Sequence, residues 1–389
     1  MHSVELFAGA GGLAMGMSRA GFDHAAVIEW DHDACQTFRE NQNRHVESVD
    51  RWPLFEMDVR QFDYRSIPNA IHVVSGGPPC QPFSLGGKHR GHLDSRNMFP
   101  EAVRAVRELW PQAFIFENVK GLLRETFSDY FEYIYLQLSY PSLSRRNGES
   151  WRDHRAKLER HHTSRRRQSE YNVVYRLLNS ADYGVPQRRE RVFLVGFRSD
   201  LGVRWTFPDQ LFSEDALLRS QWVTGDYWDR HRVAKPDRAP LSDRPAARVE
   251  KLRDMLIDGK MPWRTVRDAI ADLPDPERHP HNSIPNHCFN PGARSYPGHT
   301  GSPLDEPAKT LKAGDHGVPG GENMLCRPDG SVRYFTAREA ARLQTFPDGY
   351  IFRGAWTETM RQLGNAVPVR LAKVVADSVA QTLPPDKTA

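Results

Sequence analysis

Short apolar runs alternate with helical patterns over the first half of the chain, and this alternation constrains the fold more than any other sequence feature. The apolar runs are Ser3–Phe7, His24–Trp30, Ile71–Val74, Ala113–Phe116, Tyr171–Leu178 and Arg191–Phe197. The helical patterns between them include Leu13–Ala20, His32–Asn41 and Met98–Leu109. Strands that alternate with helices in this way are typical of βαβ units, whose strands pair in parallel. We therefore predict an α/β fold with a doubly wound, mostly parallel sheet.

The character of the chain changes after about residue 201, where prolines, arginines and tryptophans become frequent and periodicity fades. Four tryptophans in this region need a core in which to pack, which argues against disorder. They are Trp205, Trp222, Trp228 and Trp263. We therefore expect a smaller, loop-rich second domain with short strands.

Regular patterns return toward the C-terminus. Thr336 and Glu339 have the spacing of a capping box, which marks the start of a helix. A last helix fits Val367–Leu383, with Pro368 in its first turn. We predict a first domain over residues 1–198, a second over 199–356, and a C-terminal segment over 357–389 that returns to the first.

Composition excludes several classes of protein. The 389 residues are 39% hydrophobic and 26% charged, which is typical of a folded globular protein. No apolar run approaches the roughly 20 residues that cross a bilayer, and no secretory signal opens the chain. The cysteines lie far apart, so we expect no disulfide framework, no metal site and a cytoplasmic location. They are Cys35, Cys80, Cys288 and Cys326.

The net charge of +4 hides a basic stretch between Arg145 and Arg167, which has nine lysines and arginines against three acidic residues. Such a stretch either contacts a polyanion or forms a solvated helix face. Composition alone leaves both interpretations open.

Three strand ends carry residues suited to binding a nucleoside. Phe7–Gly12 follows the first strand with glycines that let a ligand approach the backbone, although such turns also serve as plain connections. Glu29 and Trp30 end the second strand, where a carboxylate can bind ribose and an indole can stack on a base. Asp58 follows a further apolar stretch and can accept from an adenine amino group. Singly these residues fit strand-end caps or core aromatics, but together they indicate an adenosine-containing cofactor.

Gly77–Ser84 is the strongest local signal, because it places Cys80 among prolines at the end of the third strand. Open α/β sheets bind ligands at that end, and prolines argue against a buried helix or strand. A nucleophilic thiol is the better interpretation, and it needs a base or a positive charge nearby. Glu117, at the end of the fourth strand, is a candidate proton donor or acceptor. Arg189 and Arg191 enter the sixth strand and, by alternation, point to one face.

These motifs together resemble the DNA cytosine-5 methyltransferases of bacterial restriction–modification systems. The resemblance covers nearly the whole chain in the family's order. Its segments are Phe7–Gly12, Glu29–Asp31, Asp58, Pro79–Gln81, Glu117–Val119, Gln187–Arg191, Arg338–Pro347 and Gly364–Val367. The resemblance implies a Rossmann-like methyltransferase fold, with residues 199–356 as the target recognition domain.

The resemblance also implies the chemistry. Cys80 would attack C6 of a cytosine that has been flipped out of the duplex, while Glu117 binds or protonates N3. C5 would then take the methyl group, lose its proton and release the thiol. Arg189 would support the cytosine carbonyl, and Arg191 the local framework.

The implied cofactor is S-adenosylmethionine. Phe7, Gly9 and Gly11 would line its methionine part, Glu29 would bind the ribose, Trp30 would stack on adenine and Asp58 would bind the adenine amino group. Pro79, Asn365 and Val367 would complete the pocket. Ala366 stands where many family members have serine, which puts one hydroxyl contact near the cofactor in doubt.

The implied macromolecular substrate is double-stranded DNA, with no membrane partner. DNA contacts would come from the loop after Cys80 and from the variable region. The candidates are Gln81, Ser84, Lys88, Arg90, Arg96, Arg294 and Lys312, with His287, His299, Lys309 and His316 as further base-reading candidates. The basic stretch would touch the DNA backbone. We expect a cytoplasmic, monomeric enzyme that associates with the nucleoid when bound to DNA, with a restriction endonuclease as a candidate companion.

Three other functions compete with this one. A tRNA cytosine-5 methyltransferase shares the same core, but Cys288, Phe289 and Asn290 match the variable-domain element of such enzymes only in part. A catalytically dead DNA-binding or scaffold homologue is disfavoured because the catalytic candidates are all present, namely Cys80, Glu117, Arg189 and Arg191. A Rossmann oxidoreductase would have a different glycine spacing. The DNA target sequence stays open.

Overall fold

The computed structural model describes residues 1–68, 70–79, 97–164, 168–238, 241, 243–255, 259–313 and 323–384. The chain forms two compact units. The first consists of Met1–Leu178, Glu190–Pro208 and Ala372–Ala389, and the second of Asn179–Arg189 and Asp209–Leu371. The boundaries predicted at residues 198 and 356 stay predictions; in this division Asn179–Arg189 belongs to the second unit, and the chain returns to the first unit at Ala372.

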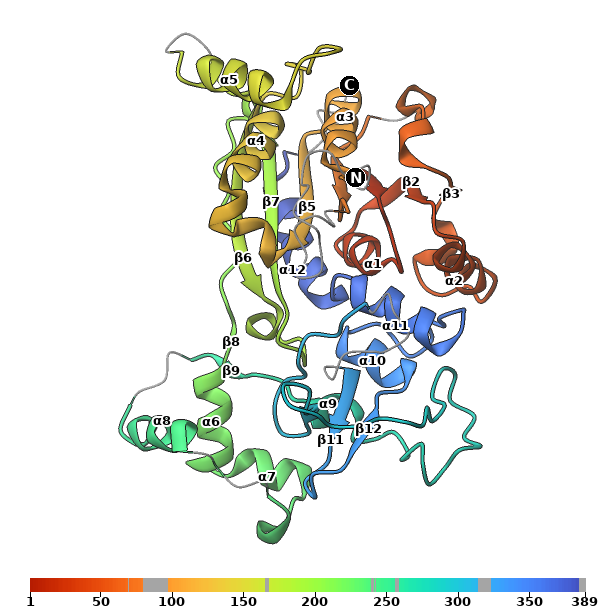
Figure 1. Ribbon diagram of the computed structural model, residues 1–389, viewed down its shortest axis with the longest axis vertical. Coiled ribbons are helices and arrows are strands. Elements are labelled where there is room, and N and C mark those ends of the chain that lie inside the picture. Colours follow the sequence, from red (N-terminus) through yellow and green to blue (C-terminus); the bar gives the residue numbers. More distant parts are fainter. Residues whose placement is uncertain are drawn as a thin grey trace. The chain divides into compact units, whose positions relative to one another are not determined.

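The first unit is built on a seven-stranded sheet with the order β3-β2-β1-β4-β5-β7-β6 (Figure 1). Its strands are β1 (His2–Leu6), β2 (Asp23–Glu29), β3 (Leu54–Glu56), β4 (Val73–Gly76), β5 (Ala113–Val119), β6 (Tyr171–Asn179) and β7 (Glu190–Arg198). The pairs from β3 through to β5 are all parallel, whereas β5 and β7 are antiparallel. The predicted mostly parallel α/β sheet is therefore confirmed.

Helices of the first unit flank this sheet. They are α1 (Gly12–Arg19), α2 (His32–Asn43), α3 (Phe99–Leu109), α4 (Ser128–Ser139), α5 (Trp151–His162) and the C-terminal part of α12 (Val369–Thr382). The three predicted helices are confirmed to within two residues, while α4 and α5 were not predicted. One sheet face packs apolar side chains such as Leu6, Val74 and Phe116 into the main core. Gly16 of α1 lies so close to Ala372 that an added Cβ would come within 2.3 Å of its Cβ, which explains the glycine.

The strands also bury polar side chains beneath α1. The Ser3 hydroxyl lies 3.0 Å from Nδ1 of His24, whose Nε2 lies 2.9 Å from the Ala14 carbonyl. The Ser75 hydroxyl donates to the Glu5 carboxyl, which is 1% exposed. Burial raises the pKa of Glu5 to about 8 and lowers the pKa of His24 to about 4. Both side chains are therefore neutral at the centre of the unit near pH 7.

The second unit contains short strands and helices joined by long loops. Its strands are β8 (Phe212–Ser213), β9 (Met261–Pro262), β10 (Ser302–Pro303), β11 (Met324–Cys326) and β12 (Val332–Tyr334). Its helices are α6 (Glu214–Trp222), α7 (Asp226–His231), α8 (Asp243–Arg253), α9 (Val266–Ile270), α10 (Ala337–Leu343) and α11 (Trp356–Asn365). This confirms the expected loop-rich region with short strands.

Three of the four tryptophans and the predicted helix cap follow the sequence expectations, whereas Trp205 belongs to the first unit. Trp228 and Trp263 belong to a buried cluster of the second unit, with Trp222 packed against it. The Thr336 hydroxyl accepts from the Glu339 amide, and the Glu339 carboxylate accepts from the Thr336 amide, so the predicted capping box is present. No helix among the described residues is both long and apolar enough to cross a membrane.

Candidate active site

The carboxyl ends of five parallel strands form one edge of the sheet in the first unit. The strand register aligns Glu56, Glu29, Gly76 and Phe116 at or next to the level of Leu6. The residues predicted for the site follow directly on this row. They are Asp58, Trp30, Phe7, Pro79 and Glu117. The fold therefore gathers cofactor candidates after β1, β2, β3 and β4, and it places the catalytic candidate Glu117 near the carboxyl end of β5.

The loop after β1 has an unusual backbone. Phe7 has a φ of 55°, Gly9 of 52° and Gly11 of 81°, all in the left-handed region. A non-glycine residue such as Phe7 seldom adopts this conformation, and such strain is concentrated at functional sites. A Cβ at Gly9 would meet nothing within 4 Å, whereas one at Gly11 would lie 2.6 Å from the Phe38 ring. Gly9 therefore leaves open space beside the loop, and Gly11 is required for packing.

Glu29 fastens this loop to the end of β2. Its Oε2 accepts from the Gly9 amide at 2.6 Å, and its Oε1 accepts from the amides of Trp30 and Asp31 at 2.9 and 2.8 Å. Burial raises the pKa of Glu29, while these three backbone donors act in the opposite direction. The carboxylate is thus oriented by the backbone before any ligand binds.

Trp30 stands out beside it because its side chain is 70% exposed. This value is the highest among the exposed large hydrophobic residues of the described chain. The alternative that Trp30 is a core aromatic is therefore excluded. An exposed indole at the carboxyl edge of a sheet is suited to stacking on a flat ring.

Asp58 starts a 3-10 turn, Val59–Gln61, just after β3. Its carboxylate accepts from the amide of Arg60 and from the guanidinium of the same residue. These hydrogen bonds hold the pKa of Asp58 below its usual value. Arg60 therefore keeps the Asp58 carboxylate ionised and fixes its orientation. The same hydrogen bonds use part of the accepting capacity of the carboxylate.

Glu117 and Arg191 form an enclosed ion pair between β5 and β7. The Arg191 Nε lies 2.8 Å from the Glu117 Oε1, with side chains 13% and 9% exposed. Burial lowers the pKa of Arg191, and the Glu117 carboxylate opposes this effect. Across from the carboxylate, a Cβ added at Gly77 would lie 3.3 Å from the Glu117 Oε2. The glycine therefore keeps this side of the carboxylate uncrowded.

The described residues on either side of positions 80–96 are anchored by hydrogen bonds. The Asn118 side chain donates to the Pro78 carbonyl at 2.9 Å, which ties the approach to Cys80 to the residue after Glu117. The Pro79 carbonyl accepts from the Met98 amide at 3.2 Å, so the residues that flank positions 80–96 are hydrogen-bonded to each other. The roles of Asn118 and Gly77 were missed, although both belong to motifs quoted above. Cys80, Gln81, Ser84, Lys88, Arg90 and Arg96 lie outside the described residues.

Arg189 differs from the expectation that it shares a face and a site with Arg191. Its side chain is fully buried in the second unit, where Nη1 donates to the Leu311 carbonyl at 3.1 Å and Nη2 to the Gly364 carbonyl at 2.7 Å. The strand β7 begins only at Glu190, so strand alternation does not apply to Arg189. The contacts favour the reverse assignment, with Arg191 beside the catalytic carboxylate and Arg189 as framework.

Candidate residues of the second unit divide by exposure. Arg294, Lys312 and Asn365 are exposed, whereas Val367 is buried. His287 is fully buried, with Nδ1 2.9 Å from the Thr336 hydroxyl and Nε2 2.8 Å from the Pro274 carbonyl. His287 is therefore a structural residue and not a base reader, which corrects the expectation. The cofactor roles of Asn365 and Val367 stay predictions.

A family model of C-5 cytosine-specific DNA methylases matches residues 1–140 and 152–381. The chain belongs to this family. The DNA cytosine-5 methyltransferase identified from the motifs is thereby confirmed.

Individual relatives agree with this assignment. Type II methyltransferase M.Eco47II of Escherichia coli is 30% identical over 98% of this chain and 79% of its own length. Type II methyltransferase M.NgoMIV of Neisseria gonorrhoeae is 30% identical over 98% of this chain and 97% of its own. In fold, a DNMT2 variant from Spodoptera frugiperda matches with a TM-score of 0.56 at 16% identity, covering 97% of this chain and 99% of that one.

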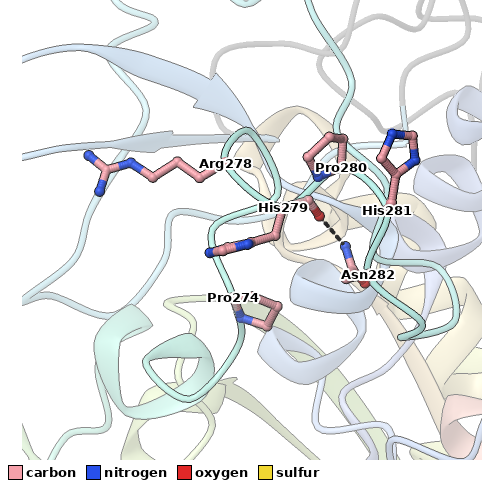
Figure 2. A pocket seen from close by; sticks show the side chains of 6 residues that line it. All are labelled: Pro274, Arg278, His279, Pro280, His281 and Asn282. Carbon is pink, nitrogen blue, oxygen red and sulfur yellow. Dashed lines mark hydrogen bonds between the residues drawn. The ribbon is translucent and has the colours of Figure 1, made fainter.

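One surface pocket of the methylase lies apart from these residues. It has a volume of about 400 Å³ in the second unit and contains none of the predicted site residues (Figure 2). Its lining is Pro274, Arg278, His279, Pro280, His281 and Asn282. The Asn282 side chain donates to the His279 carbonyl, which closes the turn on itself.

The basic stretch of the methylase forms a helical hairpin with α4. His154 is buried between the Tyr133 hydroxyl and the Leu143 carbonyl, and Arg155 pairs with carboxylates of α4. The Glu170 amide, which follows the hairpin, donates to the Ser139 carbonyl, and the Tyr171 hydroxyl donates to the Pro111 carbonyl just before β5. The hairpin therefore lies near Pro111, just before β5 begins, and Pro111 is six residues from Glu117, or about 20 Å along an extended chain.

Proposed function

We propose that this protein transfers a methyl group from S-adenosylmethionine to C5 of a cytosine in a specific double-stranded DNA sequence. The observation that carries the proposal is the enclosed Glu117–Arg191 pair, which stands beside the anchored Pro78–Pro79 approach to Cys80. The addition of a thiolate to a cytosine ring requires a proton or hydrogen-bond donor at N3 and a positive charge near the ring carbonyl, and a carboxyl group and a guanidinium next to a thiol can provide them.

In this mechanism the Cys80 thiolate forms a bond to C6 of a cytosine that has left the duplex. The electron pair of the C5–C6 double bond then shifts to C5 and, through C4, toward N3. Glu117 supplies a hydrogen bond or proton at N3. We place Arg191 at the cytosine carbonyl, because it lies against Glu117 while Arg189 is buried elsewhere. After C5 has taken the methyl group, a base removes the C5 proton and the Cys80–C6 bond breaks, restoring both the double bond and the thiolate.

The residues at the ends of β1 to β3 fit S-adenosylmethionine. Trp30 offers an exposed face for adenine, and the Glu29 carboxylate is fixed for ribose hydroxyls. Asp58 would accept from the adenine amino group, and the open side of Gly9 admits the methionine part. When bound, this cofactor supplies a methyl group on a positively charged sulfur. Phe7, Gly11, Pro79, Asn365 and Val367 complete the proposed contacts.

The relatives' names favour a role in modification of DNA beside a restriction endonuclease. We infer that the enzyme works as a monomer in the cytoplasm, with Arg294 and Lys312 among its DNA contacts. A tRNA cytosine is the alternative substrate on the same core.

Methylation sequencing of DNA from a host that expresses the chain tests this proposal. We expect 5-methylcytosine at one short sequence, and none in a matched host that expresses Cys80→Ser. Purified enzyme should also label duplex DNA and not tRNA. Methylation of tRNA with unmodified host DNA would overturn the DNA assignment, and a fully active Cys80→Ser variant would overturn the mechanism.

A further inference from the structure

The stretch just before β7 pairs with a segment far along the chain, within the second unit. The Ala308 amide donates to the Pro186 carbonyl at 3.0 Å, and the Arg188 amide donates to the Ala308 carbonyl at 2.8 Å. The Thr310 hydroxyl then donates to the Arg188 carbonyl at 2.7 Å. These bonds align residues 186–189 with residues 308–311.

Two buried side chains extend this alignment. The Gln187 Oε1 accepts from the Leu311 amide at 2.9 Å, and the Arg189 Nη1 donates to the Leu311 carbonyl at 3.1 Å. Both side chains are fully buried. The amide and the carbonyl of Leu311 are thus each hydrogen-bonded by a separate side chain, which fixes the peptide planes on both sides of Leu311.

The backbone of the next residue, Lys312, is held by a third side chain, that of Asn323. The Lys312 amide donates to the Asn323 Oδ1 at 3.0 Å, and the Asn323 Nδ2 donates to the Lys312 carbonyl at 2.9 Å. Asn323 is fully buried, whereas the Lys312 side chain is exposed. A cationic side chain therefore projects from a backbone whose polar groups are occupied on both sides.

Gly364 packs against the same segment without spare room. A Cβ at this position would lie 2.3 Å from the Ala313 amide nitrogen, and the Gly364 carbonyl is the second acceptor of Arg189. Arg189 therefore bridges the segment that ends at Lys312 and the start of the Gly364–Val367 motif. No other residue type allows this backbone approach without displacement.

We propose that Gln187, Arg189 and Asn323 are positioning residues for target recognition. They hold the backbone of residues 308–312 so that Lys312 meets DNA at a fixed place. The inference rests on the proposed function, because it takes DNA as the substrate. A contact held in advance loses less conformational entropy on binding, and a cation in a fixed place accepts fewer alternative DNA geometries. Arg189 acts through this backbone and does not touch the substrate.

A purely structural role for Arg189 predicts a different outcome, and Arg338 provides the matched control. Arg338 is also a fully buried arginine of the second unit, and it donates to the carbonyls of Pro285, Pro347 and Tyr350. None of these acceptors belongs to residues 308–313 or to Gly364. Loss of either guanidinium should destabilise the unit, but only loss of Arg189 should release the Lys312 segment.

The experiment compares Arg189→Met and Arg338→Met with the parent on duplexes that carry the parent's own target or one mismatched base pair. We expect Arg189→Met to raise KM for the target duplex by about tenfold and to lower discrimination against mismatches by about tenfold, since one mismatch costs about 5- to 150-fold. kcat on the target and affinity for S-adenosylhomocysteine should stay within about threefold. Arg338→Met should keep the parent's KM and discrimination. Equal KM and equal discrimination in the two variants would overturn the inference.

Two milder variants keep the test decisive if Arg189→Met does not fold. Asn323→Ala removes the pair of bonds to Lys312, and Thr310→Val removes one hydroxyl donor at constant shape. Both should lower discrimination in the same direction, with the larger effect for Asn323→Ala. Unchanged discrimination in both would contradict the inference. A parent enzyme that methylates no DNA would instead contradict the proposed function.

Discussion

The Arg191 guanidinium and the Glu117 carboxylate meet across two antiparallel strands, 2.8 Å apart and almost fully enclosed. Glu117 lies opposite Phe193 and Arg191 lies opposite Val119, so the pair is diagonal across the β5–β7 ladder. An enclosed pair of this kind costs free energy to desolvate, and losing one partner leaves the other charge uncompensated. The arrangement is consistent with selection for chemistry at this edge of the sheet.

Glu117→Gln tests this pair. We expect kcat to fall by about 10²- to 10⁴-fold, because a positioned acid or base contributes about that much. Binding of S-adenosylhomocysteine should not change, since Glu117 is not among the residues proposed to bind the cofactor. Single-turnover methyl transfer and calorimetry measure the two effects.

The same pair also makes a prediction for stability. Arg191→Met and Glu117→Gln should each lower the free energy of unfolding, and the double variant should lose less than the sum of the two. Urea denaturation of all four proteins gives the coupling. Strict additivity would show that the two groups do not interact.

Trp30→Ala should weaken S-adenosylhomocysteine binding by about tenfold and leave DNA affinity unchanged, because the exposed indole loses its stacking partner. Trp110→Ala is the matched control. Trp110 is 41% exposed in the same unit, but it lies just after α3 and packs on Tyr171. Equal cofactor affinity in the parent and in Trp30→Ala would remove Trp30 from the site.

Glu5 makes stability depend on pH. The folded protein holds a proton on Glu5 up to about pH 8, whereas the unfolded chain releases it near the ordinary value of 4.5. Unfolding stability should therefore fall as pH rises between 6.5 and 8, by at most about 1.4 kcal/mol per pH unit. This window lies above the titration range of His24, whose pKa is about 4 in the folded protein and 6.5 in the unfolded chain.

Glu5→Gln should reduce that slope, since an amide does not titrate, while Glu29, whose pKa burial also raises, keeps its own contribution. Chemical denaturation at both ends of the window compares the two proteins. Parallel pH profiles for the parent and the variant would contradict a neutral Glu5 in the folded state.

The basic helical hairpin gives a prediction opposite to the contact with the DNA backbone that the family resemblance implies. Arg145, Arg146 and Arg152 are exposed at the sheet edge away from Glu117, so replacing them with alanine should not change the salt dependence of target binding. Lys312→Ala should reduce the log–log slope by about 0.9, as expected for one lost phosphate contact. Fluorescence anisotropy across a salt series measures both slopes. A flatter slope for the triple variant would restore the phosphate-contact hypothesis.

Much of the first unit could be predicted because its signals are local. Parallel strands buried on both faces appear as short apolar runs, and α1 and α2 start directly after strand-end motifs. The helices α4 and α5 were missed, since α5 is mostly charged and shows a weak apolar stripe around His154 and Leu158. The short strand β3 has only Leu54, Phe55 and Glu56 to signal it.

The second unit and the two arginines show what local patterns do not contain. The prediction that Arg189 and Arg191 point to one face assumes that the alternation of side chains along β7 includes Arg189, but the strand begins one residue later. The partners of the Arg189 side chain, Leu311 and Gly364, are more than a hundred positions away. The prediction that His287 contacts DNA is wrong because the side chain is buried. Its burial depends on Pro274 and Thr336, which no sequence period links to it. Long-range hydrogen bonds of this kind follow only from the folded chain.

Trapping with 5-fluorocytosine is the most direct test of catalysis by Cys80. Fluorine at C5 cannot leave as a proton does, so the covalent bond between the thiol and C6 should persist after methyl transfer. Mass spectrometry of the digested complex should find the nucleotide adduct on the peptide that contains Cys80, and Cys80→Ser should form none. An adduct on Cys35, Cys288 or Cys326, or an adduct formed by Cys80→Ser, would contradict the assignment.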